Sequence, residues 1–102
     1  MKFYTLTLKV KKKVDGRYSR STSNFRSLFN SFVKGCQQDY KNEFKSIQYN
    51  KFATEDDAYY IFISNSEAFL EGIREKMNDL LVRAEEKQKQ EIFYEFLTSS
   101  FN

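Results

Sequence analysis

Three consecutive acidic residues, Glu55, Asp56 and Asp57, form the tightest group of carboxylates outside the predicted helices. Carboxylate oxygens are ligands that Ca²⁺ and Mg²⁺ prefer, so such a run is a candidate site for a hard cation. These ions need more ligands than this segment offers, and no glycine-spaced ligand pattern accompanies it. We therefore predict a solvated turn, with no metal and no other cofactor.

The serines and the single cysteine are the candidate nucleophiles. The chain has no histidine, the commonest general base, and its serines lie in no G-x-S-x-G or S-x-x-K pattern. Its glycines are isolated, which excludes a glycine-rich phosphate loop. Cys36 continues an apolar helical stripe, so we expect a buried and inert thiol. The sequence thus predicts a protein that is not an enzyme, with no catalytic residue and no evident small-molecule substrate.

Basic residues are concentrated in the first half of the chain. Residues 1–51 carry twelve Lys/Arg and three Asp/Glu, a net charge of 12 − 3 = +9. Residues 52–102 carry five and eleven, a net charge of 5 − 11 = −6. This asymmetry is typical of a basic half that binds a polyanion, but two halves that neutralise each other on the folded surface produce it as well.

Nucleic-acid binding is therefore the alternative hypothesis for function. Lysines and aromatic rings on an exposed sheet face can neutralise and stack single-stranded nucleic acid. If the first strand lies beside segment 58–63, two aromatic residues of that segment share its open face. The basic-glycine-aromatic signature of RNA recognition is missing, however, and lysines also protect strand edges from pairing. The candidate residues are Lys9, Lys11, Lys13, Arg17, Arg20, Tyr60 and Phe62.

An apolar cluster near the C-terminus is the basis of the leading hypothesis. It follows Glu85–Glu91, a segment without any apolar residue. If the preceding helix continued unbroken, the cluster would lie about 150° around its axis from the main apolar stripe. A contiguous exposed apolar patch marks an interaction surface. We therefore predict protein–protein interaction or self-association, such as a dimer, through Ile92, Phe93, Phe96 and Leu97.

Periodicity predicts the elements that hold these residues. Lys2–Val14 alternates apolar and polar residues, as in a strand with one buried face. Asp15-Gly16 predicts a tight turn, followed by a loop or a short returning strand. Apolar residues at helical spacing then follow an N-cap at Ser23, and this helix ends either at Gly35 or near residue 41.

The second half of the chain predicts a hairpin and a longer helix. The hairpin spans Phe44–Ile63, and its second strand is apolar on both faces, as in a central strand. Ser64 and Glu67 have the spacing of a capping box for the next helix, and Ile63 and Ala68 that of a hydrophobic staple. A continuous apolar stripe follows along this helix.

Two architectures remain for the C-terminal segment. The chain turns near residues 87–90 and Ile92–Thr98 forms a last strand, which makes a ferredoxin-like β-α-β-β-α-β two-layer α+β sandwich. Alternatively, a long C-terminal helix leaves β-α-β-β-α with an exposed apolar end. We favour the first, although Glu85–Glu91 contains no Gly, Pro or Asn for a sharp turn. We expect one α+β domain over residues 1–102, with Phe29, Ile61 and Ile73 in one core.

Composition limits the expected location. No apolar run approaches membrane-spanning length, the N-terminus lacks the apolar segment of a signal peptide, and Cys36 has no second cysteine for an internal disulfide. We therefore expect an intracellular, cytoplasmic protein that binds no membrane. Phe, Tyr, Lys and Asn are abundant and Ala, Gly and Pro scarce, as AT-rich coding DNA produces. This bias fits an accessory protein of a virus or mobile element, which if viral is located in the host cell.

Overall fold

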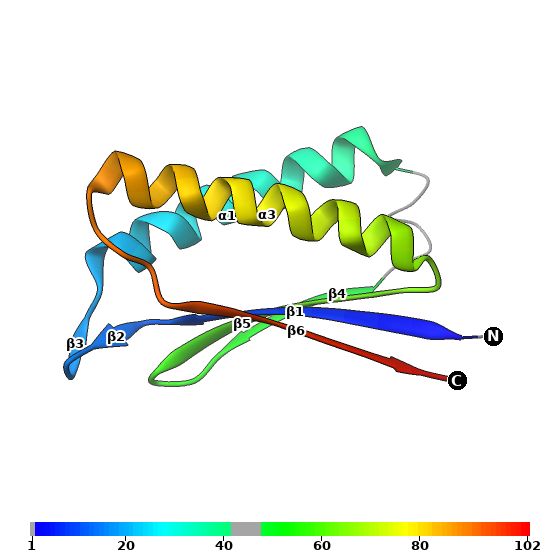
Figure 1. The fold of residues 1–102 in the computed structure, drawn as a ribbon, viewed down its shortest axis with the longest axis horizontal. Coiled ribbons are helices and arrows are strands. Elements are labelled where there is room, and N and C mark those ends of the chain that lie inside the picture. Colours follow the sequence, from blue (N-terminus) through cyan, green and yellow to red (C-terminus); the bar gives the residue numbers. More distant parts are fainter. Residues whose placement is uncertain (1, 42–47) are drawn as a thin grey trace.

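The computed structural model describes residues 2–41 and 48–102, which form six strands and two helices (Figure 1). The elements are β1 Phe3–Lys11, β2 Lys13–Val14, β3 Arg17–Tyr18, α1 Arg20–Asp39, β4 Gln48–Ala53, β5 Asp57–Ser64, α3 Glu67–Gln88 and β6 Tyr94–Phe101.

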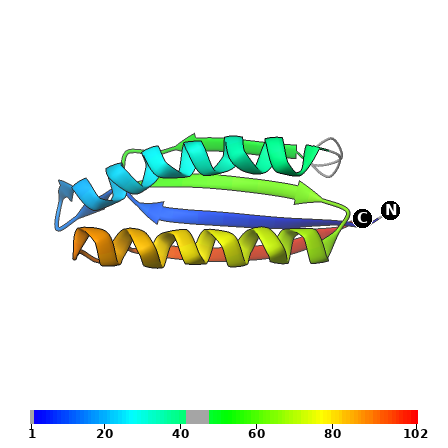
Figure 2. The ribbon, with the colours of Figure 1, turned by 90° about the horizontal axis from the view of Figure 1, so that it is seen from above.

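The four long strands form one antiparallel sheet in the order β4-β5-β1-β6, so β1 and β5 are central and β4 and β6 are the edges. Helices α1 and α3 lie side by side over one side of this sheet, and no helix of the described chain covers the other side (Figures 1 and 2). This mixed α+β arrangement is compatible with the predicted two-layer sandwich.

A short hairpin of β2 and β3 projects from one end of the molecule (Figure 1). Its turn contains Asp15 and Gly16, both with a positive φ, of 53° and 77°. Two consecutive left-handed residues are what a two-residue hairpin turn requires. The predicted tight turn is therefore confirmed, and of the two forms predicted after it the short returning strand is present.

The core lies between the helices and the covered side of the sheet. Phe29 and Ile73 are buried there, as predicted. The placement of Ile61 in the same core is wrong, because Tyr60 and Phe62 take the covered side of β5 and Ile61 points the other way. Other fully buried apolar side chains are Leu6, Leu8, Val10, Phe25, Met77 and Leu81.

Helix α1 begins before the predicted cap and ends beyond its first predicted end. Ser19 is the N-cap, and its hydroxyl accepts a hydrogen bond from the amide of Thr22 at 3.3 Å, so Ser23 lies inside the helix. The helix passes Gly35 and reaches Asp39, close to the longer of the two predictions. Several serines precede the apolar stripe and each is a good cap, so the local sequence does not select one.

Helix α3 is also capped by a different serine from the predicted one. Ser66 accepts from the amide of Phe69 at 3.2 Å. Ser64 is instead the buried last residue of β5, and its hydroxyl accepts from the amide of Ser66 at 3.0 Å. With this cap, Ile63 and Ala68 do not occupy the two positions of a hydrophobic staple, so the predicted capping box and staple are both wrong.

Strands β4 and β5 pair as the predicted hairpin. In the turn between them, the amide of Asp57 donates to the hydroxyl of Thr54 at 3.0 Å. The first part of the hairpin prediction, which begins at Phe44, falls on residues outside those that the structure describes.

The C-terminal segment turns back and forms β6 beside β1, so the predicted last strand is confirmed and the continuous helix is wrong. Lys89 makes the turn in the left-handed region, with φ 51°. Such a conformation costs a non-glycine residue roughly 1–2 kcal/mol. Burial of Ile92 stabilises the turned chain by about 1.5–3 kcal/mol, and the Glu85 carboxylate accepts from the Ile92 amide at 3.1 Å. These contacts offset the missing glycine.

Candidate interaction surface

The uncovered side of the sheet carries a defined set of residues, because directly opposed residues of an antiparallel pair share a side. Leu8 opposes Tyr60 and Phe96 on the covered side, whereas Thr7 opposes Ile61 and Leu97 on the other. We name this second side the open face. Its members are Phe3, Thr5, Thr7, Lys9 and Lys11 of β1, Gln48, Asn50 and Phe52 of β4, Asp57, Tyr59, Ile61 and Ile63 of β5, and Glu95, Leu97, Ser99 and Phe101 of β6.

The open face is mixed, because seven of its sixteen members are apolar or aromatic and nine are polar or charged. The rings of Phe52 and Tyr59 stack with centroids 4.6 Å apart, and those of Phe3 and Phe101 with centroids 5.6 Å apart. Phe52 is 52% exposed. The water-facing side of an antiparallel sheet is normally polar. Large apolar side chains gathered on such a side indicate a surface that contacts something other than water. The aliphatic residues between the two stacks are Ile61, Ile63 and Leu97.

The charges of the open face balance one another. Lys9 lies opposite Glu95, and Lys11 lies opposite Asp57. The Lys9 ammonium is also 5.9 Å from the centre of the Tyr59 ring. All four charges lie toward the end of the sheet that carries the β2–β3 hairpin, and the rest of the face is uncharged. The face is therefore neutral as a whole.

The other predicted basic residues lie elsewhere. Lys13 belongs to β2 and lies 2.8 Å from the Glu55 carboxylate and 3.9 Å from Asp56. The hydrogen bond to Glu55 raises the pKa of Lys13, and the same bond lowers the pKa of Glu55. Arg17 and Arg20 are exposed on β3 and at the start of α1. The structure thus brings only the first two of the five predicted cations onto the open face.

The predicted aromatic partners of these lysines are on the wrong side of the sheet. Tyr60 is 3% and Phe62 is 1% exposed, both under the helices. The Tyr60 ring packs against Phe29 at 4.3 Å between centroids, and its hydroxyl accepts from Arg26 Nε at 3.1 Å. Neither ring is accessible to a base, so their placement on an exposed nucleic-acid surface is wrong. Both sides of β5 are apolar, and its own sequence does not indicate which one the helices cover.

The predicted partner-binding cluster is divided between the two sides. Ile92 is buried and Phe96 packs on the core, with the Arg74 guanidinium 5.3 Å from its ring centre. Leu97 is on the open face, 43% exposed, and Phe93 is exposed beside the end of that face that carries Lys11. Two of the four residues are therefore available to a partner.

Four aromatic residues of the open face were not among the predicted site residues, namely Phe3, Phe52, Tyr59 and Phe101. Phe3 and Phe101 lie at opposite ends of the chain, and only the pairing of β1 with β6 brings them together. The one local signal was the clean alternation of the first strand, which assigns its odd positions to the less buried side. The strand register carries that assignment to β5 and β6, and register depends on tertiary pairing.

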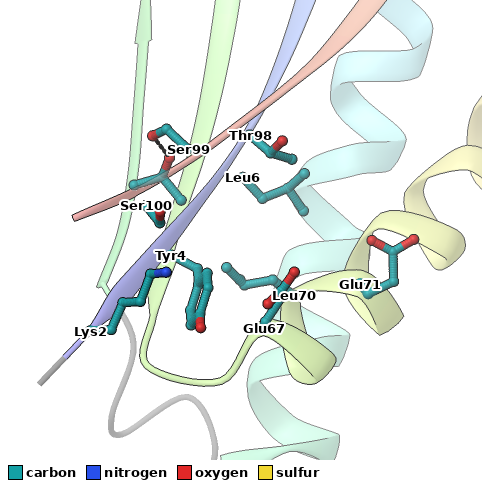
Figure 3. Close-up of a pocket in the computed structure, with 10 residues that line it drawn as sticks. Lys2, Tyr4, Leu6, Glu67, Leu70, Glu71, Thr98, Ser99 and Ser100 are labelled. Carbon is teal, nitrogen blue, oxygen red and sulfur yellow. Dashed lines mark hydrogen bonds between the residues drawn. The ribbon is translucent and has the colours of Figure 1, made fainter. Parts of the chain in front are cut away.

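A shallow pocket of about 400 Å³ lies between the start of α3 and the adjoining ends of β1 and β6 (Figure 3). Glu67 and Glu71 of α3 line it together with Lys2. Glu71 is engaged by Arg74 at 3.0 Å. The remaining lining side chains are hydroxyls and apolar groups. These lining residues are Tyr4, Thr5, Leu6, Leu70, Thr98, Ser99 and Ser100.

The cysteine, Cys36, is buried. Burial raises the pKa of the Cys36 thiol, and a thiol with a raised pKa is a poor nucleophile. Within residues 2–41 and 48–102, no three His, Cys, Asp or Glu side chains gather as a metal-binding group. No helix in the described part of the chain is both long and apolar enough to span a membrane.

No protein-family model matches the sequence, and no curated protein or solved structure gives a significant match.

Proposed function

We propose that this protein is a non-enzymatic binding protein, and that it binds another polypeptide through its open face. The observation that carries the proposal is the apolar character of a sheet side that no described element covers. Ile61 and Ile63 lie at its centre and the exposed Phe52 and Leu97 lie on its edge strands. Burial of such side chains contributes about 25 cal/mol per Å² of apolar surface, which makes this side the main source of binding free energy.

Nucleic-acid binding through the same face is the weaker candidate. Aromatic rings suited to base stacking are present, at Phe52 and Tyr59. Lys9 and Lys11 each oppose a carboxylate, however, so the face has no excess of positive charge to neutralise phosphates. Since phosphate neutralisation supplies most non-specific affinity, a neutral apolar face favours a protein partner.

We also propose that the fold is ferredoxin-like. Without the short hairpin, the elements follow the order β-α-β-β-α-β. The sheet order β4-β5-β1-β6 sets the first long strand between the third and the fourth. Both features support a split β-α-β unit repeated twice, with its two helices on one side.

A matched pair of variants tests the proposed function. Leu97→Lys introduces a charge on the open face, and Val82→Lys introduces the same charge at an equally exposed aliphatic residue of α3, 41% against 43% exposed. The wild-type chain would be immobilised, and the proteins that it retains from cells that express it would be purified. Each purified protein would then be titrated with the wild type, with Leu97→Lys and with Val82→Lys. We expect Leu97→Lys to weaken binding at least about tenfold and Val82→Lys to leave it unchanged. Equal loss with both variants, or with neither, would contradict the proposal.

Titration with labelled single- and double-stranded nucleic acid at two salt concentrations tests the alternative. We expect no affinity that falls steeply with salt. Steeply salt-dependent binding that disappears in Lys9→Glu with Lys11→Glu, two changes at side chains outside the core, would favour nucleic acid instead.

A further inference from the structure

We infer that the polypeptide bound by the open face is a second copy of this chain, and that the two copies form a two-fold dimer with β5 of each over β1 of the other. This inference rests on the proposed function and names its partner. It is carried by the distribution of large, small and charged side chains over the two central strands.

The two central columns of the open face differ in size. The β5 column contains the large side chains Tyr59, Ile61 and Ile63, whereas the neighbouring β1 column contains Thr5 and Thr7 at the opposed positions of the two isoleucines. In the middle of the face, β5 therefore forms a ridge beside the smaller threonines of β1, whereas Phe3, Lys9 and Lys11 toward the ends of the β1 column are large. A ridge beside a furrow on one surface is complementary to the same surface rotated by a two-fold axis.

The direction of that axis follows from the pattern. An axis close to the strand direction, between β5 and β1, sets Ile61 over Thr7 of the second copy and Ile63 over Thr5 of the second copy. An axis across the strands would set β5 over β5, with large side chains against large and threonine against threonine. Close-packed interfaces alternate large and small groups, so the first axis is favoured. Both axes keep the strands of the two sheets nearly aligned, as in the packing of twisted sheets about 30° apart, so the side-chain pattern selects the axis.

The charges agree with the same axis. At the hairpin end, Asp57 of one copy lies over Lys11 of the second copy, and Tyr59 lies over Lys9 of the second copy. Opposite charges and a cation above a ring are attractive, and no like charges meet in the central columns. Because the open face is neutral, two copies approach without mutual repulsion, which would not hold for a strongly basic surface.

The size of the face suits a dimer. The four strands have nine, six, eight and eight residues, and at about 3.3 Å per residue and 4.8 Å between strands they give a planar footprint of roughly 490 Å². Two such footprints bury about 980 Å² before side-chain relief is counted, close to the smallest area of a specific interface. The outer columns combine polar groups such as Gln48 and Ser99 with the exposed Phe52 and Leu97, so the interface continues beyond the two central columns.

Solution mass is the first test. Sedimentation equilibrium of the wild-type chain from about 1 μM to 1 mM covers the affinities of interfaces of this size. We expect twice the monomer mass of 12.2 kDa at the upper end of the range. Ile61→Lys should weaken dimerisation at least about thirtyfold, and Val82→Lys should leave it unchanged. Circular dichroism of each variant confirms that the fold persists.

A charge-exchange experiment tests the axis and does not depend on Ile61. Asp57→Lys opposes two cations across the interface, and Lys11→Asp opposes two carboxylates, so each variant alone should dimerise more weakly than the wild type. Mixing the two variants restores opposite charges across the interface, while the pair within each chain remains like-charged. We expect the mixed dimer to exceed either homodimer severalfold in native mass spectrometry. A mixture without that preference would overturn the proposed axis.

The outcomes separate this inference from the proposed function. A wild-type chain that is monomeric over the whole range overturns the second copy as partner. If Leu97→Lys then still abolishes binding of a different purified protein, the proposed function stands. A dimer that Ile61→Lys leaves intact would also overturn the inference, because its interface would lie elsewhere.

Discussion

The covered and open sides of the sheet are made from alternate residues of the same strands, yet helices bury only one of them. Tyr60 and Phe62 of β5 are almost completely buried under the helices, while Tyr59 and Ile61, their immediate neighbours, face away from the helices. Within β5 both sides are apolar, so there the difference is one of cover and not of composition. In β1 the open side carries threonines and lysines and is more polar than the covered side.

The number of apolar helix stripes explains this difference. Each helix has one apolar stripe, represented by Phe29 in α1 and Ile73 in α3, and both stripes are used on the same side of the sheet. No stripe in the described chain remains for the open face. Both sides of the sheet carry apolar residues, but the helices cover only one side. The chain therefore has more apolar surface than its own core buries. The surplus is what we assign to a partner.

The largest expected effect concerns β6, which contributes to both sides through Phe96 and Leu97. Deleting residues 92–102 would remove Ile92 from the core and leave β1 without its edge partner. We expect loss of the folded state, measured as loss of the thermal transition and of native far-ultraviolet circular dichroism. The control Leu97→Ser alters only the open face and should keep the transition. A shortened chain as stable as the full one would show that the two sides do not depend on this strand.

The next effect compares the two sides directly. Phe62→Ala should lower the free energy of unfolding by about 3–5 kcal/mol, because it leaves a cavity among buried side chains. Ile61→Ala should cost about 1 kcal/mol at dilute protein, since its side chain is only half-buried in the monomer. Urea unfolding measures both values. Equal costs would mean that the open face is covered within the monomer.

Two adjacent tyrosines provide a finer comparison. Tyr60→Phe removes the hydroxyl that accepts from Arg26, and should cost about 0.5–1.5 kcal/mol. Tyr59→Phe keeps the stacked ring beside Phe52 and should change the free energy of unfolding by less than about 0.5 kcal/mol. The urea midpoints of the two variants would then differ although the chemical change is the same. A larger effect at Tyr59 would reverse our assignment of the covered side.

The last effect is a pH dependence of the covered side. Burial against Phe62 raises the pKa of Tyr49 from 10.0 to about 12. The unfolded chain therefore loses this proton at lower pH than the folded chain does, so the contribution of Tyr49 is complete below pH 10 and is lost as the pH rises toward 12. Between about pH 9 and about pH 11, the urea midpoint of Tyr49→Phe should fall less than that of the wild type. An identical fall would mean that Tyr49 is as exposed as a free tyrosine.

Much of the fold was predictable from local pattern. The alternation of the first strand, the Asp15-Gly16 turn and the helical stripes around Phe29 and Ile73 all appear in the structure. Each depends on side chains within a few positions of one another, because strand and helix periods and turn conformations are local properties. These local patterns also gave the order of the long strands and helices along the chain, including the last strand.

Choices among near-equal local options were decided by tertiary contacts. Several serines fit each helix start, and the structure uses Ser19 and Ser66. No residue near the last turn favours a left-handed backbone, yet Lys89 adopts one because the chain beyond it is held by Ile92 in the core. Local energies of about 1 kcal/mol are easily outweighed by the burial of a large side chain.

The candidate surface depended most on tertiary structure. The sequence by itself determined that β5 is apolar on both sides and that the first strand carries lysines on its polar side. It did not determine that Tyr59 and not Tyr60 is the exposed ring, since a shift of one residue in register exchanges the two sides of a strand. Nor did it indicate that Phe3 meets Phe101, because that contact exists only once the two ends of the chain pair. Periodicity is a property of neighbours along the chain, whereas the side that faces the helices is a property of the assembled sheet.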